Sequence, residues 1–136
     1  MSFEYHLKTR YVDTAQDGII HHSSYITYYE EARIEYLSSH GFDINVMERQ
    51  SILCPVVSLE AHYLKPLRSL EEIVVRVCVS SCSKVRFTIL HEIYRASDKV
   101  AYGISTHCFI NASFKPIPIP DELRKGFERD MISKRG

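Results

Sequence analysis

The chain has 136 residues, of which 45% are hydrophobic, 11% are aromatic and 25% are charged. This length suits a single domain spanning residues 1–136, and the composition is that of a globular protein rather than a disordered or fibrous one. Seventeen basic residues balance seventeen acidic ones, so the chain lacks the overall positive charge that non-specific nucleic-acid binding uses, and we expect no nucleic-acid partner.

The first third of the chain predicts a strand followed by a long helix. Residues 3–12 alternate apolar and polar side chains, which is the period of a strand with one buried face. From Ser23 or Ser24, both good helix caps, apolar residues recur at spacings of three and four. Gly41 is expected to end this helix after about four turns.

The rest of the chain predicts an antiparallel meander and a short terminal helix. A weakly helical passage covers residues 43–51. Four extended segments rich in β-branched and aromatic residues follow, at 54–64, 73–82, 85–95 and 100–110. Their separators are too short for parallel crossovers. Three prolines then interrupt the pattern, and a charged helix is expected from residue 121 to about 129.

A strand, a long helix and a meander have a simple packing solution, in which the sheet curls around the helix. We therefore predict an α+β fold, with a curved antiparallel sheet of five to six strands around one long central helix. The motif Asp13-Thr-x-x-x-Gly-Ile-Ile-His-His-x-x-Tyr-x-x-Tyr-x-Glu-x-Ala-Arg, continued by Glu60-Ala-His-Tyr-Leu-Lys-Pro-Leu, resembles the hotdog-fold thioesterases of the YbgC and 4-hydroxybenzoyl-CoA thioesterase type. The resemblance covers nearly the whole chain. It implies hydrolysis of an acyl-CoA or acyl-carrier thioester to acid and thiol, without a metal or redox cofactor.

The motif departs from the family at its catalytic carboxylate. The resembling enzymes carry Asp after the Thr, as nucleophile or general base, whereas this chain has Ala15. A methyl group can neither attack a carbonyl nor accept a proton. Three explanations are an engineered replacement, use of a neighbouring carboxylate and natural loss of activity. Asp17, just before a turn at Gly18, is the nearest substitute, although it is also a typical turn residue. Asp13 is expected to be structural.

Three further positions follow from the resemblance. His22 matches a family His at the start of the helix, where its backbone N–H can polarise a thioester carbonyl and its imidazole can orient a carboxylate or water. The alternative is a histidine at a helix end without chemistry. Tyr25 keeps the family Tyr and is expected to pack, while His21 is expected to shape the pocket. Glu31 is a weaker catalytic candidate, because a second hotdog branch takes its Glu from about two turns into the helix.

Coenzyme A carries phosphate groups, which a protein without net positive charge must bind through a few suitably positioned basic side chains. Candidates are Lys65 and Arg68 after the second strand, and Lys84 and Arg86 at the next hairpin. Each is otherwise a solvated charge on a turn. The four converge only if these turns share an edge or meet across subunits. The resemblance implies a homodimer or homotetramer that pairs sheets edge to edge and builds its active sites from both protomers.

The remaining expectations concern the cysteines, the compartment and rival functions. The four cysteines are expected to be reduced, because no signal peptide is apparent, and their spacing does not suggest a metal site. No apolar run reaches the ~20 residues of a membrane span, so we expect a cytoplasmic protein. A non-catalytic acyl-CoA or acyl-carrier binding module is the main alternative to a thioesterase. A hydratase or dehydratase is weaker, since the match is to the thioesterase motif.

Overall fold

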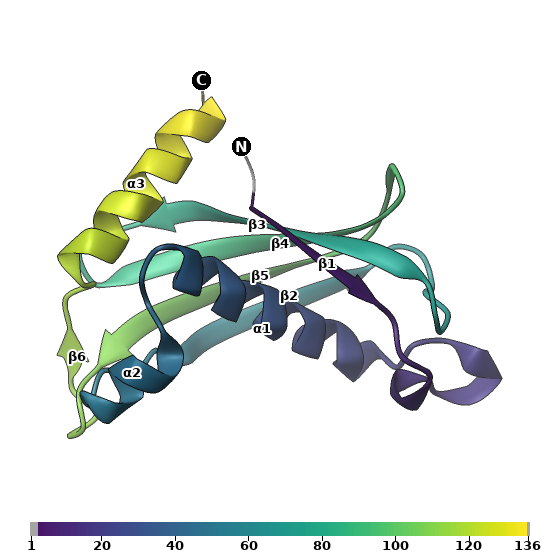
Figure 1. Cartoon of the computed structure of the whole chain (residues 1–136), viewed down its shortest axis with the longest axis horizontal. Coiled ribbons are helices and arrows are strands. Elements are labelled where there is room, and N and C mark those ends of the chain that lie inside the picture. Colours follow the sequence, from purple (N-terminus) through teal and green to yellow (C-terminus); the bar gives the residue numbers. More distant parts are fainter. Residues whose placement is uncertain (1–2, 136) are drawn as a thin grey trace.

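A computed structural model describes residues 3–135, which form one curved antiparallel sheet with a long helix against it (Figure 1). The elements in chain order are β1 (Phe3–Lys8), η1 (Tyr11–Asp13), η2 (Gln16–Gly18), α1 (His22–Ser39), α2 (Ile44–Arg49), β2 (Val56–Tyr63), β3 (Glu72–Cys82), β4 (Arg86–Arg95), β5 (Asp98–Ile110), β6 (Pro116–Ile117) and α3 (Asp121–Arg135). The sheet has the order β1-β3-β4-β5-β2, and β6 pairs with β5. Across the described range, no helix is both long and apolar enough to span a membrane.

Helix α1 is the centre of the core. Its buried residues recur at three- and four-residue spacing, so they form one face: Tyr25, Tyr28, Tyr29, Ala32, Arg33, Tyr36 and Leu37. Alternate side chains of β3, β4 and β5 are buried opposite this face. Figure 1 shows α1 running across that side of the sheet. The predicted α+β architecture, a six-stranded antiparallel sheet around a long central helix, is thereby confirmed.

Several predicted boundaries need correction. The first strand stops at Lys8 rather than near residue 12, because the chain turns into η1. The cap of α1 is His21 rather than Ser23 or Ser24; its Nδ1 accepts the backbone N–H of Ser23 at 3.2 Å. Gly41 does end the helix, with a left-handed φ of 84°. At the other end of the chain, α3 continues to residue 135, past the predicted end near 129.

The helix approaches the sheet most closely over a glycine of β5. A Cβ built on Gly103 would lie 2.5 Å from Cε2 and 2.9 Å from Cδ2 of Tyr29. The Tyr29 ring therefore occupies the space that a side chain on Gly103 would take. The Tyr29 hydroxyl is fully buried and has no hydrogen-bond partner among the described residues.

A polar cluster lies inside this core. Arg33 is 7% exposed and its Nη1 donates to Nε2 of His91 at 3.4 Å. The other ring nitrogen, Nδ1 of His91, lies 3.1 Å from the Gly103 carbonyl oxygen and donates to it. Nearby, the Ser105 hydroxyl lies 2.7 Å from Nε2 of His107. Burial first, and the positive charge of Arg33 second, lower the pKa of both histidines to about 3, so both rings are neutral at pH 7.

These histidines make the fold sensitive to acid. Their pKa in the unfolded chain is near 6.5, so between about pH 6.5 and 3 the unfolded chain binds protons that the folded chain does not. Stability is complete above pH 6.5 and falls as the pH drops, by up to about 1.4 kcal/mol per pH unit for each histidine. Urea unfolding between pH 7 and pH 4.5 is expected to show this loss. A His107→Gln variant should give a shallower decline, and an identical slope in both proteins would contradict the assignment.

Candidate active site

The segment before α1 is a tight loop closed by backbone hydrogen bonds. The N–H of Ala15 donates to the Ile19 carbonyl at 2.7 Å, and the N–H of His21 donates to the Asp13 carbonyl at 2.8 Å. At the tip, Asp17 and Gly18 both have left-handed backbone conformations, with φ of 63° and 71°. Such a conformation suits glycine and is tolerated by aspartate, which explains this pair of residues. The loop therefore leads directly into the first turn of α1.

A pocket of about 280 Å³ opens where this loop, the first turn of α1 and the end of β2 meet. It is lined by Ile19, Ile20, His22, Tyr25, Tyr63, Leu64, Lys65 and Pro66. Tyr63, which the sequence did not single out, donates its hydroxyl to the His22 carbonyl at 2.9 Å and packs edge-on against Tyr25, with ring centroids 4.9 Å apart. The predicted residues His22, Tyr25 and Lys65 thus lie together around an apolar floor.

The start of α1 offers a backbone donor beside this pocket. Within residues 3–135, the His22 N–H has no hydrogen-bond acceptor, and the residue is exposed. Free N–H groups at a helix N-terminus carry the positive end of the helix dipole and favour an anion or a developing oxyanion. The His22 backbone is therefore suited to polarising a carbonyl bound there. His21, which was expected to shape the pocket, caps the helix instead and is not among the pocket-lining residues.

The two positions considered for the carboxylate differ in their surroundings. Ala15 lies opposite Ile19, a pocket residue, across the neck of the loop. Asp17 lies at the tip; the guanidinium of Arg68 donates to its backbone carbonyl at 3.1 Å rather than to its carboxylate. Asp17 does not line the pocket. In the single chain, its geometry favours the turn role over the catalytic one.

Glu31 lies on the other side of the helix. It follows His22 by nine residues, which at about 100° per residue places it half a turn away around the α1 axis. Its carboxylate accepts the Tyr5 hydroxyl at 3.2 Å and lies 3.9 Å from Arg10. Glu31 therefore faces β1, whereas the pocket lies beside β2.

The four candidate phosphate-binding cations form two separate pairs. Lys65 and Arg68 border the pocket, and the Lys65 ammonium is bonded to Asp98 at 2.7 Å. Lys65 lies beside Val100 at one end of β5, whereas Arg86 pairs with Cys108 near the other end. Eight residues of extended strand separate these points by roughly 26 Å. Lys84 and Arg86 thus lie away from the pocket within one protomer.

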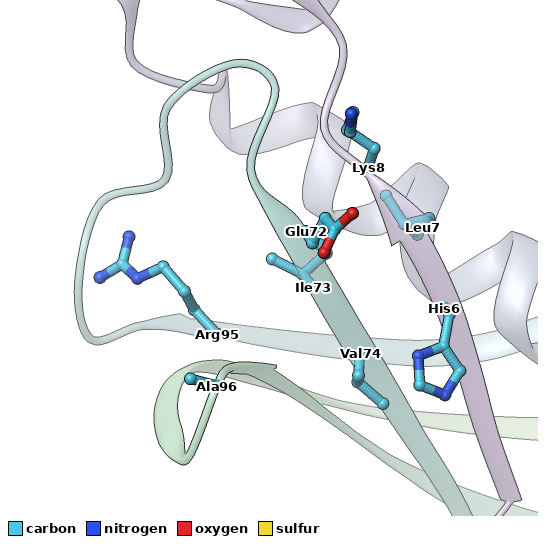
Figure 2. Close-up of a pocket in the computed structure, with 8 residues that line it drawn as sticks. All are labelled: His6, Leu7, Lys8, Glu72, Ile73, Val74, Arg95 and Ala96. Carbon is cyan, nitrogen blue, oxygen red and sulfur yellow. The ribbon is translucent and has the colours of Figure 1, made fainter.

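A larger cavity, of about 600 Å³, lies elsewhere. Figure 2 shows the eight residues that line it, which come from β1, the start of β3, the end of β4 and the turn after β4. The side chains of His6 and Glu72 belong to the exposed positions of their strands, on the face turned away from α1. None of the predicted site residues lines this cavity, so the smaller pocket at the start of α1 is the better candidate active site.

Comparison with known proteins shows which sequences and folds the chain is similar to. The sequence model of the thioesterase-like superfamily matches residues 9–127. Over 123 residues the chain is 31% identical to "Putative acyl-CoA thioesterase YneP" of Bacillus subtilis, covering 89% of this chain and 86% of that protein. A hypothetical protein from Aquifex aeolicus has a crystal structure that superposes with a TM-score of 0.86 at 29% identity, covering 90% and 97% of the two chains. A 1,4-dihydroxy-2-naphthoyl-CoA thioesterase from Synechocystis shares the fold, with a TM-score of 0.87 at 20% identity over 93% and 96%.

Proposed function

We propose that this chain, which belongs to the thioesterase-like superfamily, binds an acyl-CoA or acyl-carrier thioester at the pocket beside His22. The single observation that carries the proposal is the unpaired His22 N–H at the start of α1, next to an apolar pocket. The thioester carbonyl oxygen would accept this N–H. Its acyl group would lie against Ile20 and Tyr25, and Lys65 and Arg68 would meet the phosphates of the carrier thiol.

The chemistry at this site is hydrolysis to a carboxylic acid and a free thiol. A general base removes a proton from water, the water oxygen attacks the carbonyl, and the resulting oxyanion is held by the His22 N–H at the start of α1. The tetrahedral intermediate then expels the thiolate, which takes up a proton. With Ala15 the family's base is missing, so we propose that the chain as it stands turns over slowly or only binds thioesters.

We further propose a cytoplasmic homodimer or homotetramer. Strand β2 is an edge of the sheet, and Val56, Leu59 and Tyr63 on it are 47%, 39% and 44% exposed. An unpaired edge with exposed apolar side chains favours pairing with a second copy. Antiparallel pairing of two β2 strands would bring the start of one strand beside the end of the other. In that assembly, a carboxylate of one protomer could reach the pocket of its partner.

Thiol release from a panel of acyl-CoAs tests this function. We expect slow release by the unaltered chain, and an Asp17→Asn variant shows whether the remaining carboxylate supplies the base. Abolition of the residual activity by Asp17→Asn would establish a relocated carboxylate. Equal activity in both proteins would assign Asp17 to the turn alone. Saturable CoA binding without thiol release would favour the non-catalytic binding module. The absence of both thiol release and CoA binding would contradict the proposal.

A further inference from the structure

Another cavity, of about 250 Å³, lies farther along α1 and beside the start of β2. Its polar wall includes Arg33, Cys54 and His107, and its apolar wall includes Ile34 and Leu37. Arg33 follows His22 by eleven residues, which places it about 16 Å along the helix from the candidate active site. The cavity is smaller than a typical drug-sized pocket, so it suits a small ligand.

The cation in this cavity lacks a matching buried anion. The Arg33 side chain is 9% exposed, and the nearest carboxylate oxygen, on Glu30, lies 3.9 Å from Nη2. That distance is too long for a hydrogen bond, and the Glu30 side chain is 62% exposed to water. The hydrogen bond that the structure gives the guanidinium within the described residues is to His91. Buried charges are normally paired with an opposite charge, so Arg33 is left with unused donors and a positive charge.

The neighbouring titratable groups do not supply the missing negative charge. His91 and His107 are neutral at pH 7, as described above; Nε2 of His91 accepts from Arg33, and Nε2 of His107 is hydrogen-bonded to the Ser105 hydroxyl. Burial raises the pKa of the Cys54 thiol to about 12, so it is also neutral and can donate a weak hydrogen bond. Glu30, at the exposed rim of the cavity, has the carboxylate nearest to the Arg33 guanidinium. The positive charge and the unused hydrogen-bond donors of Arg33 therefore favour binding of a small anion with several acceptor atoms.

We propose that this cavity binds the carboxylate of a small aliphatic carboxylic acid. The two carboxylate oxygens accept N–H groups of Arg33, which is the planar pairing that guanidinium and carboxylate favour. The hydrocarbon part of the acid packs against Ile34 and Leu37. This site goes beyond the proposed hydrolysis, because binding of a free acid needs neither the base nor the oxyanion donors. It takes the class of compound that thioester hydrolysis releases.

An NMR titration of the ¹⁵N-labelled full chain with butanoate at pH 7 tests the site. The neutral isostere butanamide serves as the matched ligand. We expect butanoate to shift the backbone signals around Arg33 and Val56, and butanamide to bind at least tenfold more weakly. Arg33→Met, which keeps the length of the side chain, is expected to weaken butanoate at least tenfold. Glu30→Gln removes a competing carboxylate and is expected to tighten butanoate binding.

The controls separate this site from the active-site pocket and from failure to fold. Lys65→Gln, which removes a cation at the candidate active site, should leave butanoate affinity unchanged. Equal affinity of Arg33→Met and the unaltered chain, or loss of binding in Lys65→Gln alone, would overturn the proposal. If Arg33→Met does not fold by circular dichroism, equal binding of butanoate and butanamide with no effect of Glu30→Gln would overturn it. The titration does not depend on thiol release, so the proposed hydrolysis and this site can fail independently.

Discussion

An Ala15→Asp variant is expected to hydrolyse acyl-CoA about 10²–10⁴-fold faster than the unaltered chain, the usual contribution of a general base. Residue 15 lies at the neck of the loop, where its backbone N–H is bonded to Ile19, one of the pocket residues. A carboxylate at this point is held at the hydrogen-bonded neck of the loop, next to the pocket. Measurement of kcat and kcat/KM by thiol release from several acyl-CoAs would show the gain.

Ala15→Asn is the matched control, because an amide has the size and polarity of the carboxylate but cannot take a proton from water. We expect Ala15→Asn to remain as slow as the unaltered chain and all three proteins to bind CoA alike. An equally slow Ala15→Asp, with intact folding and CoA binding, would contradict the assignment of this position. In that case the chain would act as a binding module rather than as an inactive enzyme.

A Gly103→Ala variant is expected to lose about 1–3 kcal/mol of unfolding free energy, or more, through overpacking. The new methyl group would meet the Tyr29 ring at 2.5 Å, and that ring is 0% exposed and cannot move into solvent. Gly103 also pairs with His91 and Ala61 on the two neighbouring strands, so the backbone cannot easily shift. Urea unfolding followed by circular dichroism would measure the loss.

Variants of Tyr29 test whether the ring is the cause. Tyr29→Phe keeps the two ring carbons that the methyl group would meet, so Gly103→Ala should cost as much in that background. Tyr29→Leu removes them, and the additional cost of Gly103→Ala should then fall. An equal cost in all three backgrounds would assign the loss to the strand backbone instead of to helix packing.

Most of the architecture was predictable because the spacing of apolar residues and the lengths of the segments decide which helices and strands form. The spacing of three and four from Ile26 to Leu37 predicts an amphipathic helix, and the β-branched and aromatic residues in 73–82 and 85–95 predict strands. Boundaries were less predictable. The alternation through residue 12 does not reveal that η1 ends the strand at Lys8, and serine is a commoner helix cap than the histidine used here.

The candidate site was predictable in part. Motif position identifies His22 and Tyr25, which do line the pocket beside α1. Tyr63 belongs to the second motif, but its role was missed because that role depends on where β2 ends relative to α1. The separation of Lys65 and Arg86 likewise follows from strand direction in the folded sheet. Whether these residues act in catalysis stays a prediction.

The sheet order also has a consequence for how the chain reaches its folded state. Strands β3, β4 and β5 are joined by short turns. By contrast, β1 pairs with β3, and β2 pairs with β5, although long stretches of chain separate the partners. Closing a long loop costs more conformational entropy than closing a hairpin. The pocket needs both the loop before α1 and the end of β2, and the hydrogen bond from Tyr63 to His22 that joins them closes 41 residues of chain. Binding of a ligand there would therefore select chains in which this long-range contact between the loop before α1 and the end of β2 has already formed.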